Sequence, residues 1–67
     1  MSISYKKLWK LLMDKDMKKK DLKIAAGISS SSITKMSKNE NVSTETLTKV
    51  CVALDCDIAD IVEIIKE

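Results

Sequence analysis

The sequence has no proline, no histidine, no arginine and no phenylalanine, and Gly27 is its only glycine. Tyr5 and Trp9 are its only aromatic residues. All-β barrels and sandwiches are rich in strand-favouring aromatic residues and in glycine or proline turns. The scarcity of both, in a chain of 67 residues of which 45% are apolar, predicts an all-α fold. We expect a single domain over residues 1–67, because a chain this short buries only about 60% of its unfolded surface.

Without histidine, the chain lacks the side chain that most often serves as a general base or a metal ligand. Cys51 and Cys56 have no second cysteine pair with which to form a zinc site. We interpret them as small, half-buried residues in a reducing cytosol. A glycine-rich phosphate loop is also missing. The sequence therefore predicts no catalytic residue, no metal and no cofactor, and enzymes are the weakest class of candidates.

Long apolar runs are absent as well. No stretch approaches the roughly 20 residues that cross a bilayer. The first residues, MSISYKKLWKLL, lack the apolar segment and the cleavage site of a secretory signal. We expect a cytoplasmic protein without membrane association, and its length leaves no room for a domain that senses a small-molecule ligand.

The charges are unevenly distributed. All twelve basic residues are lysines, and the formal net charge is +2. Residues 1–20 carry seven lysines and two aspartates, whereas residues 42–67 carry two lysines and six acidic residues. A basic front and an acidic back can orient a protein on a polyanion, although chance also segregates charges in short chains. We interpret four of the front lysines as a solvated face: Lys6, Lys7, Lys10 and Lys15.

The apolar periodicity predicts five helices, over residues 4–13, 18–26, 29–38, 44–54 and 58–65. Side chains that can accept a hydrogen bond from a first-turn amide stand at the start of four of them, at Ser4, Ser29, Ser43 and Asp57. The expected core positions are Tyr5, Leu8, Trp9, Leu11, Leu12, Leu22, Ala25, Ala26, Ile33, Met36, Leu47, Val50, Cys51, Leu54, Ile58, Ile61, Val62 and Ile65.

The segment KKDLKIAAGISSSSITKMSK, residues 19–38, has the pattern of a DNA-binding helix-turn-helix. Ala26 is small where the two helices must cross, Gly27 suits the turn, and the isoleucine after it can plug the core. Ile33 and Met36 then face inward from the second helix at helical spacing. The opposite face of that helix stays polar and free.

The four consecutive serines, residues 29–32, would mark a flexible linker in many chains. A linker is not followed at once by an inward-facing apolar pair, so we interpret Ser29 as the N-cap of a helix. Ser30 and Ser31 are expected to project from its first turn, and Ser32 to pack near the turn between the helices.

Three stretches resemble the phage-repressor-like (Cro/cI-type, Xre) helix-turn-helix family, and above all its small stand-alone bacterial regulators. They are SYKKLWKLLMDKDM, DLKIAAGISSSSITKM and STETLTKVCVALDCDIADIVE, and together they cover nearly the whole chain. The resemblance implies a compact five-helix bundle of the lambda-repressor-like type that binds duplex DNA, with the helix that starts at the serine run as recognition helix.

Three positions depart from the family pattern. Lys23 stands where most members have an alanine against the crossing helix, so its side chain must extend outward or the helices must pack apart. Lys18 and Lys19 replace a threonine cap and a glutamine that contacts phosphate. Lysine binds phosphate as a point charge, without the directional hydrogen bond of the amide.

We predict that the exposed face of the recognition helix contacts bases. Lys35 can reach guanine O6 or N7 and the Thr34 methyl can meet a thymine methyl, whereas serine discriminates bases weakly. Moderate specificity is expected, with DNA shape and dimer spacing contributing. The candidate base contacts are Ser30, Ser31, Thr34 and Lys35. The candidate phosphate contacts are Lys19, Lys20, Ser29, Lys38, Asn39 and Asn41.

The predicted function is sequence-specific binding of double-stranded DNA by a transcriptional regulator, most simply a repressor that occupies a promoter. The C-terminal helix is apolar on more than one face. It either completes the core or supports a homodimer on half-sites about 34–36 Å apart. The alternative function is a protein-interaction module, such as an antitoxin, with little DNA specificity of its own.

Overall fold

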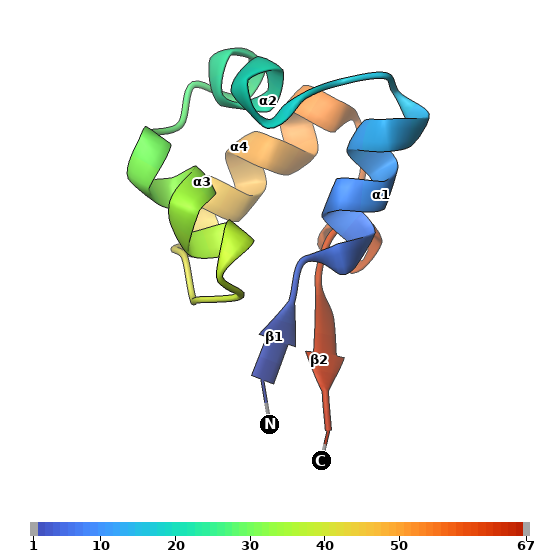
Figure 1. Ribbon diagram of the computed structural model, residues 1–67, viewed down its shortest axis with the longest axis vertical. Coiled ribbons are helices and arrows are strands. Elements are labelled where there is room, and N and C mark those ends of the chain that lie inside the picture. The colour runs from blue at the N-terminus through green and yellow to red at the C-terminus, as the bar shows by residue number, and fades with distance from the viewer. Residues whose placement is uncertain (1, 67) are drawn as a thin grey trace.

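The computed structural model describes residues 2–66 and is mostly helical (Figure 1). Its four α-helices are α1 (Lys6–Asp14), α2 (Lys19–Ala26), α3 (Ser30–Ser37) and α4 (Thr44–Leu54). A single 3-10 turn, η1 (Ile58–Asp60), and two short strands, β1 (Ser2–Ser4) and β2 (Glu63–Ile65), complete the described chain. The first four predicted helices are confirmed. The five-helix, all-α prediction is wrong at its last element.

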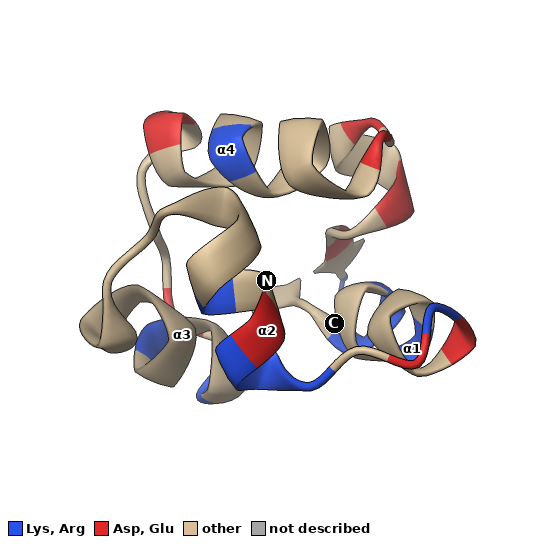
Figure 2. Cartoon of the chain, turned by 90° about the horizontal axis from the view of Figure 1, so that it is seen from above, with Lys and Arg blue, Asp and Glu red and all other residues tan. Residues whose placement is uncertain are grey.

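One hydrophobic core joins these elements. α2 packs against both α4 and α3, while η1 contacts α1 and α4. Viewed from above, α4 lies on one side of the molecule and α1, α2 and α3 lie on the other (Figure 2). The buried apolar side chains between them are Tyr5, Leu8, Leu12, Leu22, Ile28, Met36, Leu47, Val50, Leu54 and Ile61. Most of the predicted core is therefore confirmed.

The expected helix over residues 58–65 is replaced by the η1 turn and a strand. β2 pairs antiparallel with β1, so that Ser2 lies opposite Ile65 and Ser4 lies opposite Glu63. The two strands form a ribbon that extends beyond the helices and holds the first and last described segments side by side (Figure 1). The segment IVEII is rich in β-branched residues, which favour strands when a partner strand is available. Here the partner lies at the opposite end of the chain.

The predicted cap at Ser4 is wrong, because Ser4 belongs to β1 and α1 begins one residue later, after Tyr5. The backbone amide of Tyr5 donates to Asn39 Oδ1 at 3.3 Å. Its buried phenol donates to the carbonyl of Glu40 at 2.9 Å. The loop after α3 therefore holds Tyr5 at the start of α1, while the Ser4 hydroxyl accepts the amide of Lys6 at 3.3 Å from outside the helix.

Each helix is followed by a residue in the left-handed region. These residues are Asp16 (φ 55°), Gly27 (φ 66°), Asn39 (φ 57°) and Asp55 (φ 53°). After α3, the amides of Asn39 and Glu40 donate to the carbonyls of Met36 and Lys35 at 3.1 and 2.8 Å, which satisfies carbonyls that the helix leaves free. Aspartate and asparagine tolerate this conformation better than other L-residues. They therefore end three helices in a chain with one glycine.

Three predicted core positions lie at the surface instead. Ala25 is exposed because the inner face of α2 is supplied by Leu22 and Ala26. Ile58 is 46% exposed because the 3-10 turn sets it at a corner of the molecule, and Ile65 is 38% exposed on the ribbon. For Ile58 and Ile65, the periodicity assumed a helix that does not form.

Candidate nucleic-acid interface

The serine run begins the second helix of the helix-turn-helix, as predicted. Gly27 ends α2 in the left-handed conformation, and the buried Ile28 anchors the turn in the core. Ser29 is the N-cap of α3, and its hydroxyl accepts from the amide of Ser32 at 3.2 Å. Such a cap stabilises a helix by roughly 1 kcal/mol. It fixes where the exposed face of α3 starts.

The remaining serines divide between the cap and the solvent. Ser32 is half-buried, and its hydroxyl lies 3.2 Å from that of Ser29, so the prediction that it packs near the turn is confirmed. The hydroxyl of Ser31 lies 3.0 Å from that of Ser29, while its side chain remains exposed. Ser30 is exposed as well. The run is an ordered helix start and not a linker.

The four candidate base contacts come together on one exposed surface of α3. Ser30, Ser31, Thr34 and Lys35 are all exposed, whereas Met36 on the inner side is fully buried. The hydroxyl of Thr34 donates to the carbonyl of Ser30 at 3.0 Å. Because that hydroxyl donates within the helix, the methyl group is the more available part of Thr34.

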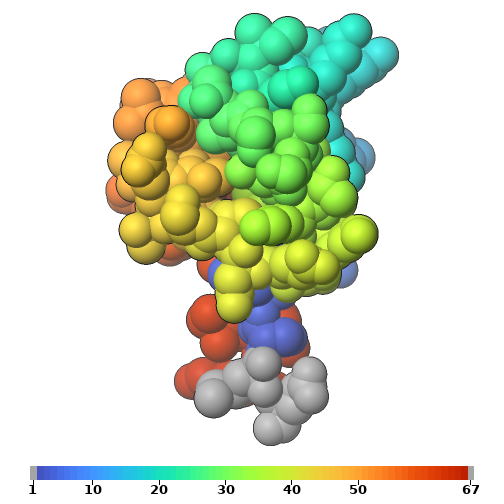
Figure 3. All heavy atoms as spheres, turned by 90° about the vertical axis from the view of Figure 1, so that its left-hand side faces the viewer, coloured from blue at the N-terminus to red at the C-terminus, as the bar shows by residue number. Residues whose placement is uncertain are grey.

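A groove of about 320 Å³ separates this surface from α2. It is lined by Lys19, Lys20 and Lys23 from α2 and by Ser30, Ile33 and Thr34 from α3. Figure 3 shows α3 (green) near the middle of this face, with α2 above it. Lys19 and Lys20, both candidate phosphate contacts, thus border the candidate base contacts.

Lys23 was not among the predicted site residues, although its departure from the family pattern was noted. Its side chain is exposed and lines the groove, which confirms the outward direction that its long stem allows. The signal was present in the sequence: a lysine in place of a small residue, one helical turn after Lys19.

Of the other candidate phosphate contacts, Ser29 is the cap at the start of α3, and the remaining three lie at its far end. Lys38, Asn39 and Asn41 are exposed there. Asn39 also has a structural role, because its Oδ1 accepts the amide of Tyr5. Its side-chain amide group is a donor and can still meet a phosphate oxygen.

The charges are unevenly distributed over the molecule. Lysine segments of α1, α2 and α3 lie along one side, together with a few acidic segments, whereas acidic segments lie at the start of α4 and in the turn after it (Figure 2). Within residues 2–66, the one ion pair is Glu45 with Lys49 on α4, at 3.5 Å. The lysines beside the groove are therefore not neutralised by an acidic partner in the described structure, and they can attract a polyanion.

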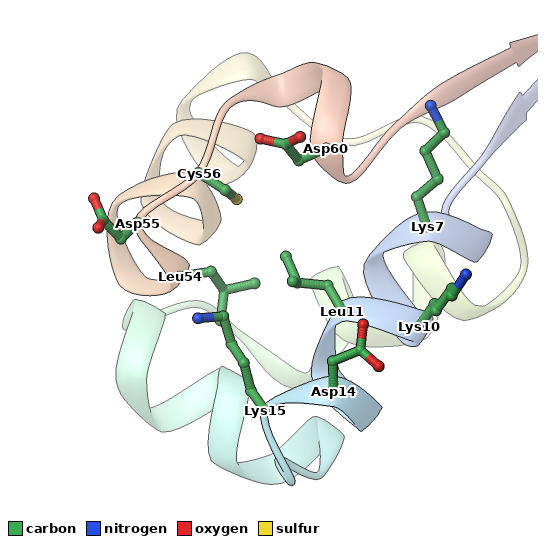
Figure 4. Close-up of a pocket in the computed structure, with 9 residues that line it drawn as sticks. All are labelled: Lys7, Lys10, Leu11, Asp14, Lys15, Leu54, Asp55, Cys56 and Asp60. Atoms are coloured by element: carbon green, nitrogen blue, oxygen red, sulfur yellow. The ribbon is translucent and has the colours of Figure 1, made fainter.

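A second hollow, of about 370 Å³, lies between α1 and the corner that follows α4 (Figure 4). Lysines and aspartates line it together with Leu11, Leu54 and Cys56. Burial, reinforced by the neighbouring Cys51, raises the pKa of the Cys56 thiol to about 11. The thiolate is the reactive form of cysteine. This thiol is consequently protonated near neutral pH and is not an activated nucleophile.

A capped recognition helix, crossed by a second helix at a glycine turn and flanked by unpaired lysines, defines a DNA-binding protein of the helix-turn-helix class. The chain matches the model of the Cro/C1-type HTH DNA-binding domain over residues 7–67. It therefore belongs to that family.

A solved structure is also similar to the whole chain. It is the crystal structure of the transcriptional regulator VanUg in form II, with a TM-score of 0.93 and 52% sequence identity. The similarity covers 98% of this chain and 88% of that one. No curated protein sequence matches the chain. The family and this neighbour assign the chain to DNA-binding transcriptional regulators. Among the described residues, no helix has the length and apolar character needed to span a bilayer.

Proposed function

We propose that this chain is a sequence-specific regulator that places the exposed surface of α3, from Ser30 to Lys35, in the major groove of duplex DNA and represses transcription by occupying a promoter. The observation that supports this most is the exposed polar surface of α3 directly beside the lysine-lined groove of α2. The major groove admits an α-helix. The phosphates at its edge would then meet the groove lysines, whose charges release counterions from the DNA.

The side chains divide into two roles. Lys35 and Thr34 carry most of the base discrimination, Lys35 toward guanine and Thr34 toward the thymine methyl, with Ser30 and Ser31 as weaker, adaptable contacts. Lys19, Lys20, Lys23 and Lys38 bind phosphates and set the register without reading sequence. Because no arginine or glutamine stands on this surface, we expect moderate specificity.

Selection from a pool of random duplexes, at about 100 mM salt because such binding is salt-dependent, tests this function. We expect an enriched site. Binding without enrichment would contradict sequence-specific recognition and leave only non-specific binding by the basic side. No binding of any duplex would instead support the protein-interaction module.

We further propose that two copies bind DNA together, through β2 and not through a C-terminal helix. All three residues of β2 are exposed, and two of them are isoleucines. A two-stranded ribbon is marginally stable alone, and an open strand edge is a template for pairing. Antiparallel pairing of β2 with the β2 of a second copy would give a four-stranded sheet around a two-fold axis.

Sedimentation equilibrium over a range of protein concentrations tests the dimer. Ile64→Lys and Ile65→Lys should shift the protein to monomer. Val52→Lys is the matched control, because Val52 is 77% exposed on α4, away from the ribbon. A wild-type protein that stays monomeric at all concentrations, or equal effects of all three variants, would contradict pairing through β2.

A further inference from the structure

Three helices meet at the side chain of Lys19. Its ammonium nitrogen lies 4.4 Å from the centroid of the Trp9 ring, on α1. The same nitrogen donates to Ser37 Oγ at 2.9 Å, on the last turn of α3. Lys19 itself is the first residue of α2. One cation thus connects α1, α2 and the end of the recognition helix.

Each partner of this ammonium is itself fixed. Ser37 donates its hydroxyl proton to the carbonyl of Ile33 at 3.0 Å, so its lone pairs face Lys19. Trp9 is half-buried and packs against the core. A lysine ammonium is attracted to the face of a tryptophan ring, the strongest aromatic partner for a cation. The ring and the hydroxyl together select one position for a side chain that is otherwise flexible.

The fixed ammonium still has donors to spare. It carries three N–H groups, and Ser37 uses one of them. The side chain is exposed and borders the groove between α2 and α3. A side chain that is already ordered loses less conformational entropy when it binds. For one side chain, this difference raises the affinity about two- to tenfold.

We propose that Trp9 is a positioning residue for DNA binding: without touching DNA, it holds the Lys19 ammonium against Ser37, where that cation meets a phosphate. This rests on the proposed phosphate contact of Lys19. Trp9 is on α1, outside the helix-turn-helix, and it was expected only to fill the core. The ring of Trp9 thus packs against the core and also holds a cation of the proposed interface.

A double-mutant cycle with a fluorescently labelled duplex of about 20 base pairs tests this, with affinity measured by anisotropy between about 50 and 200 mM salt. Lys19→Gln should lower the slope of log K against log salt by about 0.9, because a neutral amide no longer neutralises a phosphate charge. Trp9→Leu should weaken binding about two- to tenfold and leave that slope unchanged. The double variant should bind no more weakly than Lys19→Gln. Lys10→Gln, on the exposed side of α1, is the matched control for charge.

A second readout separates positioning from a structural effect. Methylene protons of Lys19 that lie over the ring should be shifted upfield in the NMR spectrum of the free protein, and Trp9→Leu should abolish that shift. If Trp9→Leu does not fold, Trp9→Phe, which keeps a weaker ring, serves in its place and should give smaller effects. Additive losses in the cycle, or the absence of an upfield shift, would overturn the proposal. An unchanged slope in Lys19→Gln, with wild-type protein still selecting a site, would refute the Lys19 contact and leave the proposed function standing.

Discussion

At the scale of single residues, the side chains of α3 differ in whether their hydrogen-bond donors are free to contact DNA. The hydroxyls of Thr34 and Ser37 donate to carbonyls of their own helix, whereas Lys35 and Lys38 are exposed with open donors. The helix thus offers two lysines in different positions: Lys35 on its exposed surface next to Thr34, and Lys38 just beyond its end. Their substitutions should separate base recognition from phosphate binding.

Lys38→Ala should weaken binding to every duplex about equally and lower the salt slope by about 0.9, because only a phosphate contact is lost. Lys35→Ala should instead reduce discrimination at one position of the site, by about 1 kcal/mol. Affinities for the selected duplex and for single-base variants of it measure both effects. Unchanged affinity and preference in Lys35→Ala would show that the recognition surface has been misplaced.

Because of Tyr5, the free energy of unfolding should depend on pH in the alkaline range. Burial raises the pKa of its phenol, so the folded state keeps the proton that the unfolded chain releases near pH 10. The stability from this group is complete below pH 10 and is lost as the pH rises through the higher, folded pKa. Tyr5→Phe should cost about 1 kcal/mol at neutral pH, the typical value of the lost hydrogen bond to Glu40.

Urea unfolding of both proteins between pH 7 and 11 measures this difference. The stability of Tyr5→Phe should fall less steeply than that of wild type above pH 10. Parallel curves would show that the phenol does not titrate differently in the two states.

At the scale of elements, the sequence predicts a helix correctly where its ends are set by residues close to it in the chain. Ser29 and Ser43 accept amides of Ser32 and Thr46, three residues on, and Gly27 stops α2. Each signal acts within a few residues, so α2, α3 and α4 were placed closely from the sequence. The exposed surface of α3 could be predicted for the same reason: its four candidate residues lie on one side of a helix whose start was known.

The C-terminal segment could not be predicted in this way. Its isoleucines fit a helical stripe as well as a strand, and the choice is made by β1, which lies opposite it. Asn39 shows the same limit, because its hydrogen bond to the Tyr5 amide joins residues 34 positions apart. Hydrophobic periodicity contains no information on such long-range contacts. The neighbours of Lys23 and Trp9 are likewise determined only by how the helices pack together.

The helix ends offer a stability prediction at this scale. Asp16 holds the left-handed position after α1 at φ 55°, where glycine is less strained. Asp16→Gly should raise the free energy of unfolding by about 0.5 kcal/mol. The matched control is Asp14→Gly, which removes the same charge inside α1 and should cost up to about 1 kcal/mol. Thermal unfolding compares them, and destabilisation by Asp16→Gly would contradict the assigned helix end.

At the scale of the whole molecule, the uneven distribution of charge and the position of the ribbon both indicate which side of the protein faces DNA. Most lysines of α1, α2 and α3 lie on the side away from α4 and the acidic turn that follows it (Figure 2). The ribbon lies at the opposite end of the molecule from α2 (Figure 1). A polyanion should thus meet the helix-turn-helix first, and α4 should stay free of DNA.

Amide NMR shifts, followed residue by residue as a duplex of the selected sequence is added, test this orientation most directly. The account predicts that the largest changes fall on residues 19–23 and 29–38, with Trp9 affected through Lys19 and the exposed face of α4 unchanged. Changes centred on α4 or on β2, with α3 unperturbed, would contradict it.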